Sequence, residues 1–132
     1  MVKFKNEIDK KLMLHLHPLI LMVLFDAQFY LSENYNYNLT VTATLSDREI
    51  DKEIGRESAT HRTGRAIDLR SRDMNEEMII DLVSFFNDKY KEIAAVSNRS
   101  GIPTLIIVES SHLHLQINKR YALPEVNSIS DL

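Results

Sequence analysis

Histidine and carboxylate side chains gather in two short segments of the chain, in a pattern that suits one catalytic zinc ion. His61 and Asp68 lie in the first segment, and Glu109, His112 and His114 lie in the second. A catalytic zinc ion takes three nitrogen or oxygen ligands from the protein and keeps a fourth position for water. His61, Asp68 and His114 can supply these ligands. Glu109 is then the candidate for the carboxylate that takes a proton from water and passes it to a leaving amine.

The second segment predicts a hairpin that brings its polar side chains onto one face. If Ser110 and Ser111 form a two-residue turn, Glu109 and His112 are directly opposed across an antiparallel pair. His114, two residues further on, points the same way as His112. The apolar neighbours then face the other side: Val108, Leu113 and Leu115.

Each of these residues also has an ordinary structural explanation. Taken singly, Asp68 could accept hydrogen bonds within a turn, and His61 could be a loop histidine. His15 and His17 form another His-X-His pair, but they lie in or before an apolar helix with no acidic pattern nearby. We therefore interpret His15 and His17 as structural, and only the joint pattern of the other residues as a metal site.

The first segment carries a longer signature. In the pattern Ser-X-His-X-X-Gly-X-Ala-X-Asp, His61, Gly64, Ala66 and Asp68 all occupy their positions. A second signature, His-X-His preceded by an acid or a histidine, is met by the segment that ends at His114. Together these blocks resemble the zinc metallopeptidase superfamily of D-alanyl-D-alanine carboxypeptidases, the vancomycin-resistance dipeptidase, phage L-alanyl-D-glutamate endolysins and the hedgehog amino-terminal domain.

The resemblance implies hydrolysis of an amide bond in bacterial peptidoglycan peptides, of carboxypeptidase or endolysin type, with one Zn²⁺ ion as cofactor. Some relatives use a Glu-X-X-His spacing, which makes His112 the third ligand, whereas the His-X-His relatives use the second histidine. We favour His114 as the ligand and place His112 beside it, where it stabilises the oxyanion or orients water.

Two positions depart from the family pattern. Ala59 stands where the signature has serine, between Ser58 and Thr60, and Arg48 follows the Thr-rich segment slightly out of register with the family's arginine. We expect Arg48 to steady the substrate carboxylate or the oxyanion. The departures leave open a catalytically inactive zinc-binding domain that acts through protein contacts, as the hedgehog domain does, or a phage accessory or structural protein whose histidines bind nothing.

Composition limits the classes of protein and partner. The 132 residues are 44% hydrophobic, which predicts one domain over residues 1–132. The chain has no cysteine, so a metal must be held by histidine and carboxylate. Its net charge of −3 offers no basic field for phosphates, and we expect no nucleic-acid partner.

The amino-terminal lysines and the apolar run over residues 12–25 superficially resemble a signal peptide. The run contains His15, His17 and Pro18, ends at Asp26, and is too short to cross a bilayer. We interpret it as a buried helix and expect no membrane span. The expected location is the cytoplasm until release, or association with a particle.

The surrounding pattern predicts an α+β fold, a small antiparallel sheet flanked by helices with the zinc site on one sheet face. Pro18 starts a helix to about Leu31, and Asp73 with Glu76 forms a capping box for a helix from Met74 to about Val96. Strands are expected over residues 39–45, 66–69, 104–109 and 112–117. The charged stretch 46–60 is expected to be mainly a loop beside the site, with at most a short helix.

Overall fold

The computed structural model describes all residues from 1 to 132, and its centre is a five-stranded sheet. The strands lie in the order β1-β2-β3-β7-β6, with β1 parallel to β2 and every other neighbouring pair antiparallel. Their bounds are Lys3–Phe4 (β1), Thr40–Ala43 (β2), Ala66–Arg70 (β3), Ile106–Val108 (β6) and His112–Gln116 (β7). A separate two-stranded sheet pairs Ala95–Val96 (β4) with Pro103–Thr104 (β5). The expected α+β fold is confirmed, and β1 is a strand that the pattern did not predict.

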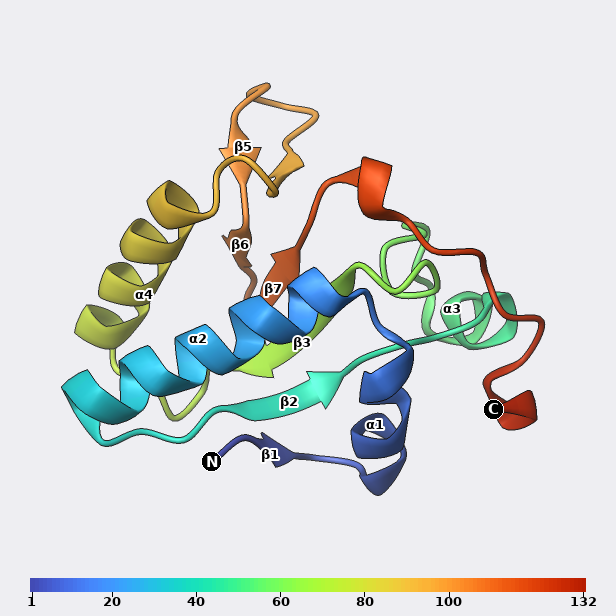
Figure 1. The fold of residues 1–132 in the computed structure, drawn as a ribbon, viewed down its shortest axis with the longest axis horizontal. Coiled ribbons are helices and arrows are strands. Elements are labelled where there is room, and N and C mark those ends of the chain that lie inside the picture. The colour runs from blue at the N-terminus through green and yellow to red at the C-terminus, as the bar shows by residue number, and fades with distance from the viewer.

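Helices α2 (Pro18–Tyr35) and α4 (Glu76–Lys89) cover one face of the sheet (Figure 1). The shorter α1 (Glu7–Leu12) lies near β1, and α3 (Arg48–Ile54) lies at the end of the molecule where the carboxyl terminus also lies (Figure 1). Three short 3-10 helices complete the structure, at Met13–His15, Lys119–Tyr121 and Ile129–Asp131. No helix is long and apolar enough to span a membrane.

The hydrophobic core fills the space between the sheet and these two helices. Alternate residues of the central strands point into it, with Ile67 and Leu69 of β3 opposite Leu115 and Leu113 of β7. Phe86 of α4 is fully buried and packs on Tyr30 of α2. Because side chains alternate along a strand, the other face of the same strands carries the polar residues.

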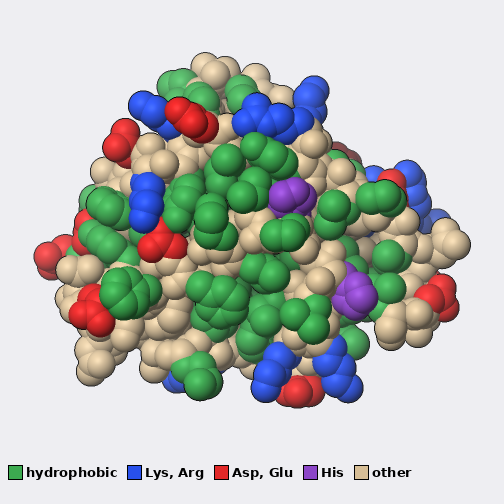
Figure 2. Space-filling view, viewed as in Figure 1, with side chains coloured by type: hydrophobic (Ala, Val, Ile, Leu, Met, Phe, Trp, Pro, Cys, Tyr) green, Lys and Arg blue, Asp and Glu red, His purple; other side chains and the backbone are tan.

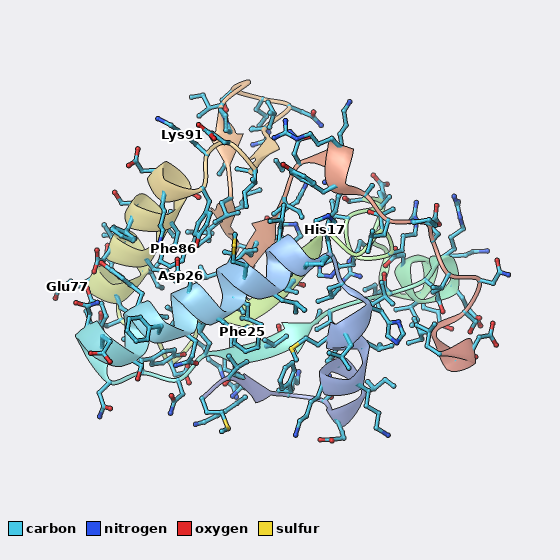
Figure 3. All side chains as sticks on the ribbon, viewed as in Figure 1. His17, Phe25, Asp26, Glu77, Phe86 and Lys91 are labelled. Carbon is cyan, nitrogen blue, oxygen red and sulfur yellow. The ribbon has the colours of Figure 1, made fainter.

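The outer surface of α2 is also apolar. Figure 2 shows hydrophobic side chains gathered across the middle of this face of the molecule, over the helix. Phe25 is half exposed, whereas its neighbour Asp26 lies between α2 and α4 and accepts hydrogen bonds from Lys89 and Tyr90 (Figure 3). The helix is therefore apolar on more than its core-facing side.

The ends of two helices, α2 and α4, differ from expectation. The predicted start of α2 at Pro18 is confirmed, with His17 as its cap, since its Nδ1 accepts from the backbone N–H of Leu19 (Figure 3). The helix continues beyond Leu31 to Tyr35, and Asn36 closes it with a φ of 51°. The helix is longer than expected because residues 32–35 stay helical although most of them are polar.

Helix α4 is shorter than predicted at both ends. Asn75, and not Asp73, caps it by accepting from the backbone N–H of Met78 at 2.8 Å. The Asp73 carboxylate instead accepts from the hydroxyl of Tyr37. The expected continuation to Val96 is wrong, because the chain leaves the helix after Lys89 and forms β4.

Residues 46–60 contain one short helix of seven residues, α3, with irregular backbone on both sides of it, as expected. Asp47 belongs to this charged stretch, yet it is only 3% exposed. It caps α3 through Ile50 N–H and also accepts from Ile129 N–H, so it ties the carboxyl-terminal segment to this helix. Burial of Asp47 is possible because both bonds satisfy its charge.

Candidate metal centre

Strands β3 and β7 place Asp68 and His114 directly opposite each other on the face away from the helices. Asp68 Oδ1 and His114 Nδ1 are 2.9 Å apart. Residues opposed across an antiparallel pair share one face. The two side chains therefore meet because of the strand register, and the core residues Leu69 and Leu113 beside them hold that register in place.

His61 reaches the same point from the tight turn that precedes β3. The turn is closed by hydrogen bonds from Gly64 N–H to His61 O and from Arg65 N–H to Thr60 O, each 3.1 Å long. Gly64 has a φ of 69°, a left-handed conformation that favours glycine. His61 Nε2 lies 3.3 Å from Asp68 Oδ1. One ligand atom from each of His61, Asp68 and His114 falls within 4.8 Å of the others, so this group could hold a metal ion.

The second ring nitrogen of each histidine is already engaged. His61 Nδ1 lies 2.7 Å from the carbonyl oxygen of Thr44, and His114 Nε2 lies 2.9 Å from Gln116 Oε1. Both partners are acceptors, so these nitrogens carry the protons as donors. The nitrogens that face Asp68, His61 Nε2 and His114 Nδ1, are the ones left for a metal ion, and a second ring nitrogen held by a neighbouring oxygen is usual for histidine ligands of metals.

The Thr44 carbonyl is itself fixed in position. Asp9 is buried and accepts hydrogen bonds from both the backbone N–H of Thr44, at 3.0 Å, and its hydroxyl, at 2.7 Å. His61 is only 1% exposed, so its ring has little freedom to turn. This arrangement holds the imidazole in one orientation before any metal binds.

The charges at the centre are strongly coupled. Burial alone would raise the pKa of Asp68, but hydrogen bonds from His114 and His61 outweigh it and hold that pKa well below its usual value. Burial alone would lower the pKa of His114, and its hydrogen bonds to Asp68 and Gln116 raise it instead. Asp68 is thus a carboxylate at neutral pH, the form that a metal ion requires.

The predicted hairpin is confirmed by the register. Glu109 N–H donates to His112 O at 2.9 Å across Ser110 and Ser111, and Val108 pairs with Leu113. Glu109 therefore lies opposite His112 on the side of the metal group, although it is exposed. His112 Nε2 lies 3.6 Å from Asp68 Oδ1, slightly further than the ring of His114.

Arg48 does not join this group. Its side chain is 75% exposed and forms an ion pair with Glu125. The arginine nearest to the centre is Arg56, whose Nη2 lies 3.9 Å from Asp68 Oδ2. Arg56 is held there by Asp51, which is 1% exposed and accepts from its Nη1 at 2.8 Å.

A cleft of about 790 Å³ runs beside the centre, with Ile107, Glu109 and Gln116 among its lining residues and β4 and β5 along one side. Ser58 also lines it, whereas Ala59 offers no hydroxyl at the signature position. The three metal-ligand candidates do not line this cleft, which adjoins the group through Gln116, the hydrogen-bond partner of His114, and extends to the exposed Glu109.

Sequence reasoning missed three supporting residues: Thr44, Arg56 and Gln116. Gln116 was detectable, since it continues the alternation of His112 and His114 along β7. Thr44 acts through its backbone carbonyl, which carries no signal of residue type. The position of Arg56 near Asp68 depends on the bend of the chain after α3, which the sequence pattern does not predict.

Comparisons of the chain with protein-family models, with curated proteins and with solved structures found no match, and the centre is therefore interpreted from its own geometry.

Proposed function

We propose that this protein is a zinc-dependent peptidase that hydrolyses an amide bond. The observation that carries the proposal is the convergence of His61, Asp68 and His114 on one point, with the second nitrogen of each imidazole engaged by a neighbouring oxygen. A set of two imidazoles and one carboxylate suits zinc, and three protein ligands are typical of catalytic rather than structural zinc sites.

The position of the group also favours catalysis. It lies on the polar face of the sheet, and the neighbouring cleft reaches Gln116, which contacts His114, and the exposed Glu109. A structural zinc site has four protein ligands and is closed. His112 is the only further imidazole near enough to be a fourth ligand, but its side chain is 30% exposed and its Nδ1 is 3.1 Å from the hydroxyl of Ser111.

Each side chain has a role in the proposed reaction. A zinc ion, when bound, makes water acidic enough to form hydroxide near neutral pH and polarises a carbonyl group. Glu109 accepts the proton of the attacking water and delivers it to the leaving amine. His112 and Arg56 stabilise the oxygen of the scissile carbonyl as it becomes negative. Gln116 and Thr44 keep the rings of His114 and His61 in place.

The resemblance to the cell-wall peptidases supports a substrate class, a bacterial peptidoglycan peptide with a D-amino acid near the cleaved bond. The fold agrees with that expectation at the level of an α+β architecture with a candidate metal group on a sheet face. Both a carboxypeptidase and an endolysin type of cleavage suit the open cleft.

The proposal is tested by zinc content and by release of amino groups from purified peptidoglycan. We expect one zinc per wild-type chain, none in His61→Ala, and full zinc in His15→Ala, a matched control outside the centre. Glu109→Gln should keep its zinc and lose at least about a hundredfold in turnover, since it removes only the proton acceptor. A wild-type protein without zinc would contradict the proposal, as would full activity in Glu109→Gln.

A second candidate keeps the zinc but works through protein contacts. Two observations favour it: Ala59 replaces the signature serine, and α2 exposes large apolar side chains, with Phe29 65% and Phe25 50% accessible. Apolar patches of this kind often mark contacts with other proteins. Zinc binding without any release of amines from peptidoglycan would support this candidate over the peptidase.

A further inference from the structure

A second cavity, of about 440 Å³, opens next to the metal centre on the far side of Gln116. Its polar lining includes Thr60, Arg65, Asn98, Gln116, Asn118 and Lys119, and no aspartate or glutamate is among its lining residues. In a chain with a net charge of −3, a cavity with two cations and no carboxylate is locally positive. Its charge is complementary to an anion.

Two of the lining residues have polar atoms without a partner. Thr60 is 3% exposed, and its Oγ1 makes no hydrogen bond. Arg65 donates from Nη1 to the carbonyl of Ile117 at 3.0 Å, but its Nε–H is buried and unpaired. An unsatisfied buried polar group destabilises the fold, so a ligand that supplied a hydrogen-bond partner to these groups would bind favourably.

The cations of this cavity also differ from the arginines near Asp51. Arg56 and Arg62 both form ion pairs with Asp51. Neither Arg65 nor Lys119 forms an ion pair in the structure. Burial lowers the pKa of Arg65, but an arginine stays charged in proteins. Its guanidinium is partly desolvated without a counter-ion, which favours binding of an external anion.

We infer that this cavity is an anion subsite that binds a carboxylate group of the ligand, through Arg65, Thr60 and Lys119. Gln116 connects it to the metal group, because its Oε1 accepts from His114 while its amide nitrogen donates to no protein group. Two residues along a strand span roughly 6–7 Å. An extended peptide whose carbonyl lies at the metal group would thus place a carboxylate about two residues away from the cleaved bond into the cavity.

The position of the peptide rests on the proposed function, but anion binding itself needs no metal. The inference is tested by ¹H–¹⁵N NMR of the whole protein, in which the Arg65 Nε–H gives its own signal. Three probes are titrated: an N-acetylated dipeptide with a free carboxylate, the same dipeptide as its carboxamide, and inorganic phosphate.

We expect the carboxylate peptide to shift the Arg65 Nε–H signal and the backbone signals of Thr60 and Gln116, and the carboxamide to leave them unchanged. Arg65→Gln should weaken binding about tenfold or more, and Thr60→Val several-fold, as expected when a hydrogen bond to a charged group is lost. Thr60→Ser keeps the hydroxyl and should bind as the wild type. Arg72→Gln, an exposed arginine outside the cavity, is the matched control.

Equal shifts with the carboxamide, or equal weakening by Arg72→Gln, would overturn the subsite. Tighter binding of phosphate than of the peptide at Arg65 would overturn its assignment to a carboxylate. The two proposals fail separately. Carboxylate binding in a protein that holds no zinc would contradict only the peptidase, and peptidoglycan cleavage unaffected by Arg65→Gln and Thr60→Val would contradict only the subsite.

Discussion

Substitution of Gly64 by alanine tests whether the turn before β3 positions His61. Gly64 has a φ of 69°, and a Cβ built there lies 3.1 Å from Leu123 Cδ1 and 3.4 Å from the carbonyl oxygen of His15. The left-handed conformation costs an alanine about 1–2 kcal/mol. The close contacts add about 1 kcal/mol more, because Leu123 must move to admit the methyl group. We therefore expect Gly64→Ala to lose roughly 2–3 kcal/mol of unfolding free energy.

Gly55→Ala is a matched control, since its φ is 75° but a Cβ there meets no atom within 4 Å. It should lose only the conformational part, about 1–2 kcal/mol. Urea unfolding of the metal-free proteins measures both values. A competition titration with a chromophoric chelator should show zinc binding weakened about tenfold by Gly64→Ala, since the turn holds His61, and unchanged by Gly55→Ala.

The double variant Gly64→Ala with Leu123→Ala separates the contact from the backbone strain. Removing the Leu123 side chain should recover the contact share, so that Gly64→Ala costs no more in that background than Gly55→Ala does in the wild type. Equal losses of stability and unchanged zinc affinity for the two glycine variants would refute the view that this turn positions the histidine.

Three further results are expected. Gln116→Met should weaken zinc binding by about ten- to a hundredfold in the chelator titration, because His114 loses the acceptor of its Nε2 proton. Zinc at a hundredfold excess over its dissociation constant should raise the unfolding free energy by about 2.7 kcal/mol, and EDTA should abolish this gain in urea unfolding. Backbone N–H groups of Ile50 and Ile129 hold the pKa of Asp47 below its usual value, so its carboxylate stabilises the fold above about pH 4 and that contribution is lost as the pH falls. The difference in unfolding free energy between wild type and Asp47→Asn should accordingly shrink between pH 7 and pH 3.

The candidate metal group could be predicted from sequence because strand alternation and turn length are local rules. The two-residue spacing of His112 and His114 and the Ser110-Ser111 turn are enough to bring one face of the hairpin together. The opposition of Asp68 to His114 needs the order of the strands as well, and here the family signature supplied what periodicity could not.

The identity of the arginine near the centre could not be predicted from local sequence patterns. Arg48 is closer in sequence to the position that the resemblance suggested, yet it lies on exposed α3 and pairs with Glu125. Arg56 reaches Asp68 because α3 ends at Gly55 with a φ of 75° and the chain then turns back towards Asp51. The Arg56–Asp51 pair is local in sequence, but the approach of Arg56 to Asp68 of β3 depends on how the chain packs after α3, and no local pattern predicts it.

The predicted start of α4 was wrong for a related reason. Asp73 and Asn75 are both good capping residues, and the choice between them was made by tertiary contact, since the hydroxyl of Tyr37 binds Asp73. Asn75 was then left to cap α4. Propensity names the candidates for a cap, and long-range hydrogen bonds select among them.

The alternation that builds the core also determines how rigid each part of the centre is. Leu113 and Leu115 are fully buried and alternate along β7 with the polar residues of the site. A shift of register by one residue would therefore exchange the core side chains with those of the site. Asp68 and His114 are therefore as firmly placed as the core itself. Glu109 lies at the exposed end of the hairpin, and no core contact of this kind holds its side chain. The ligand set is preorganised by the fold, whereas the proton acceptor is left free to adjust to the substrate that enters the cleft.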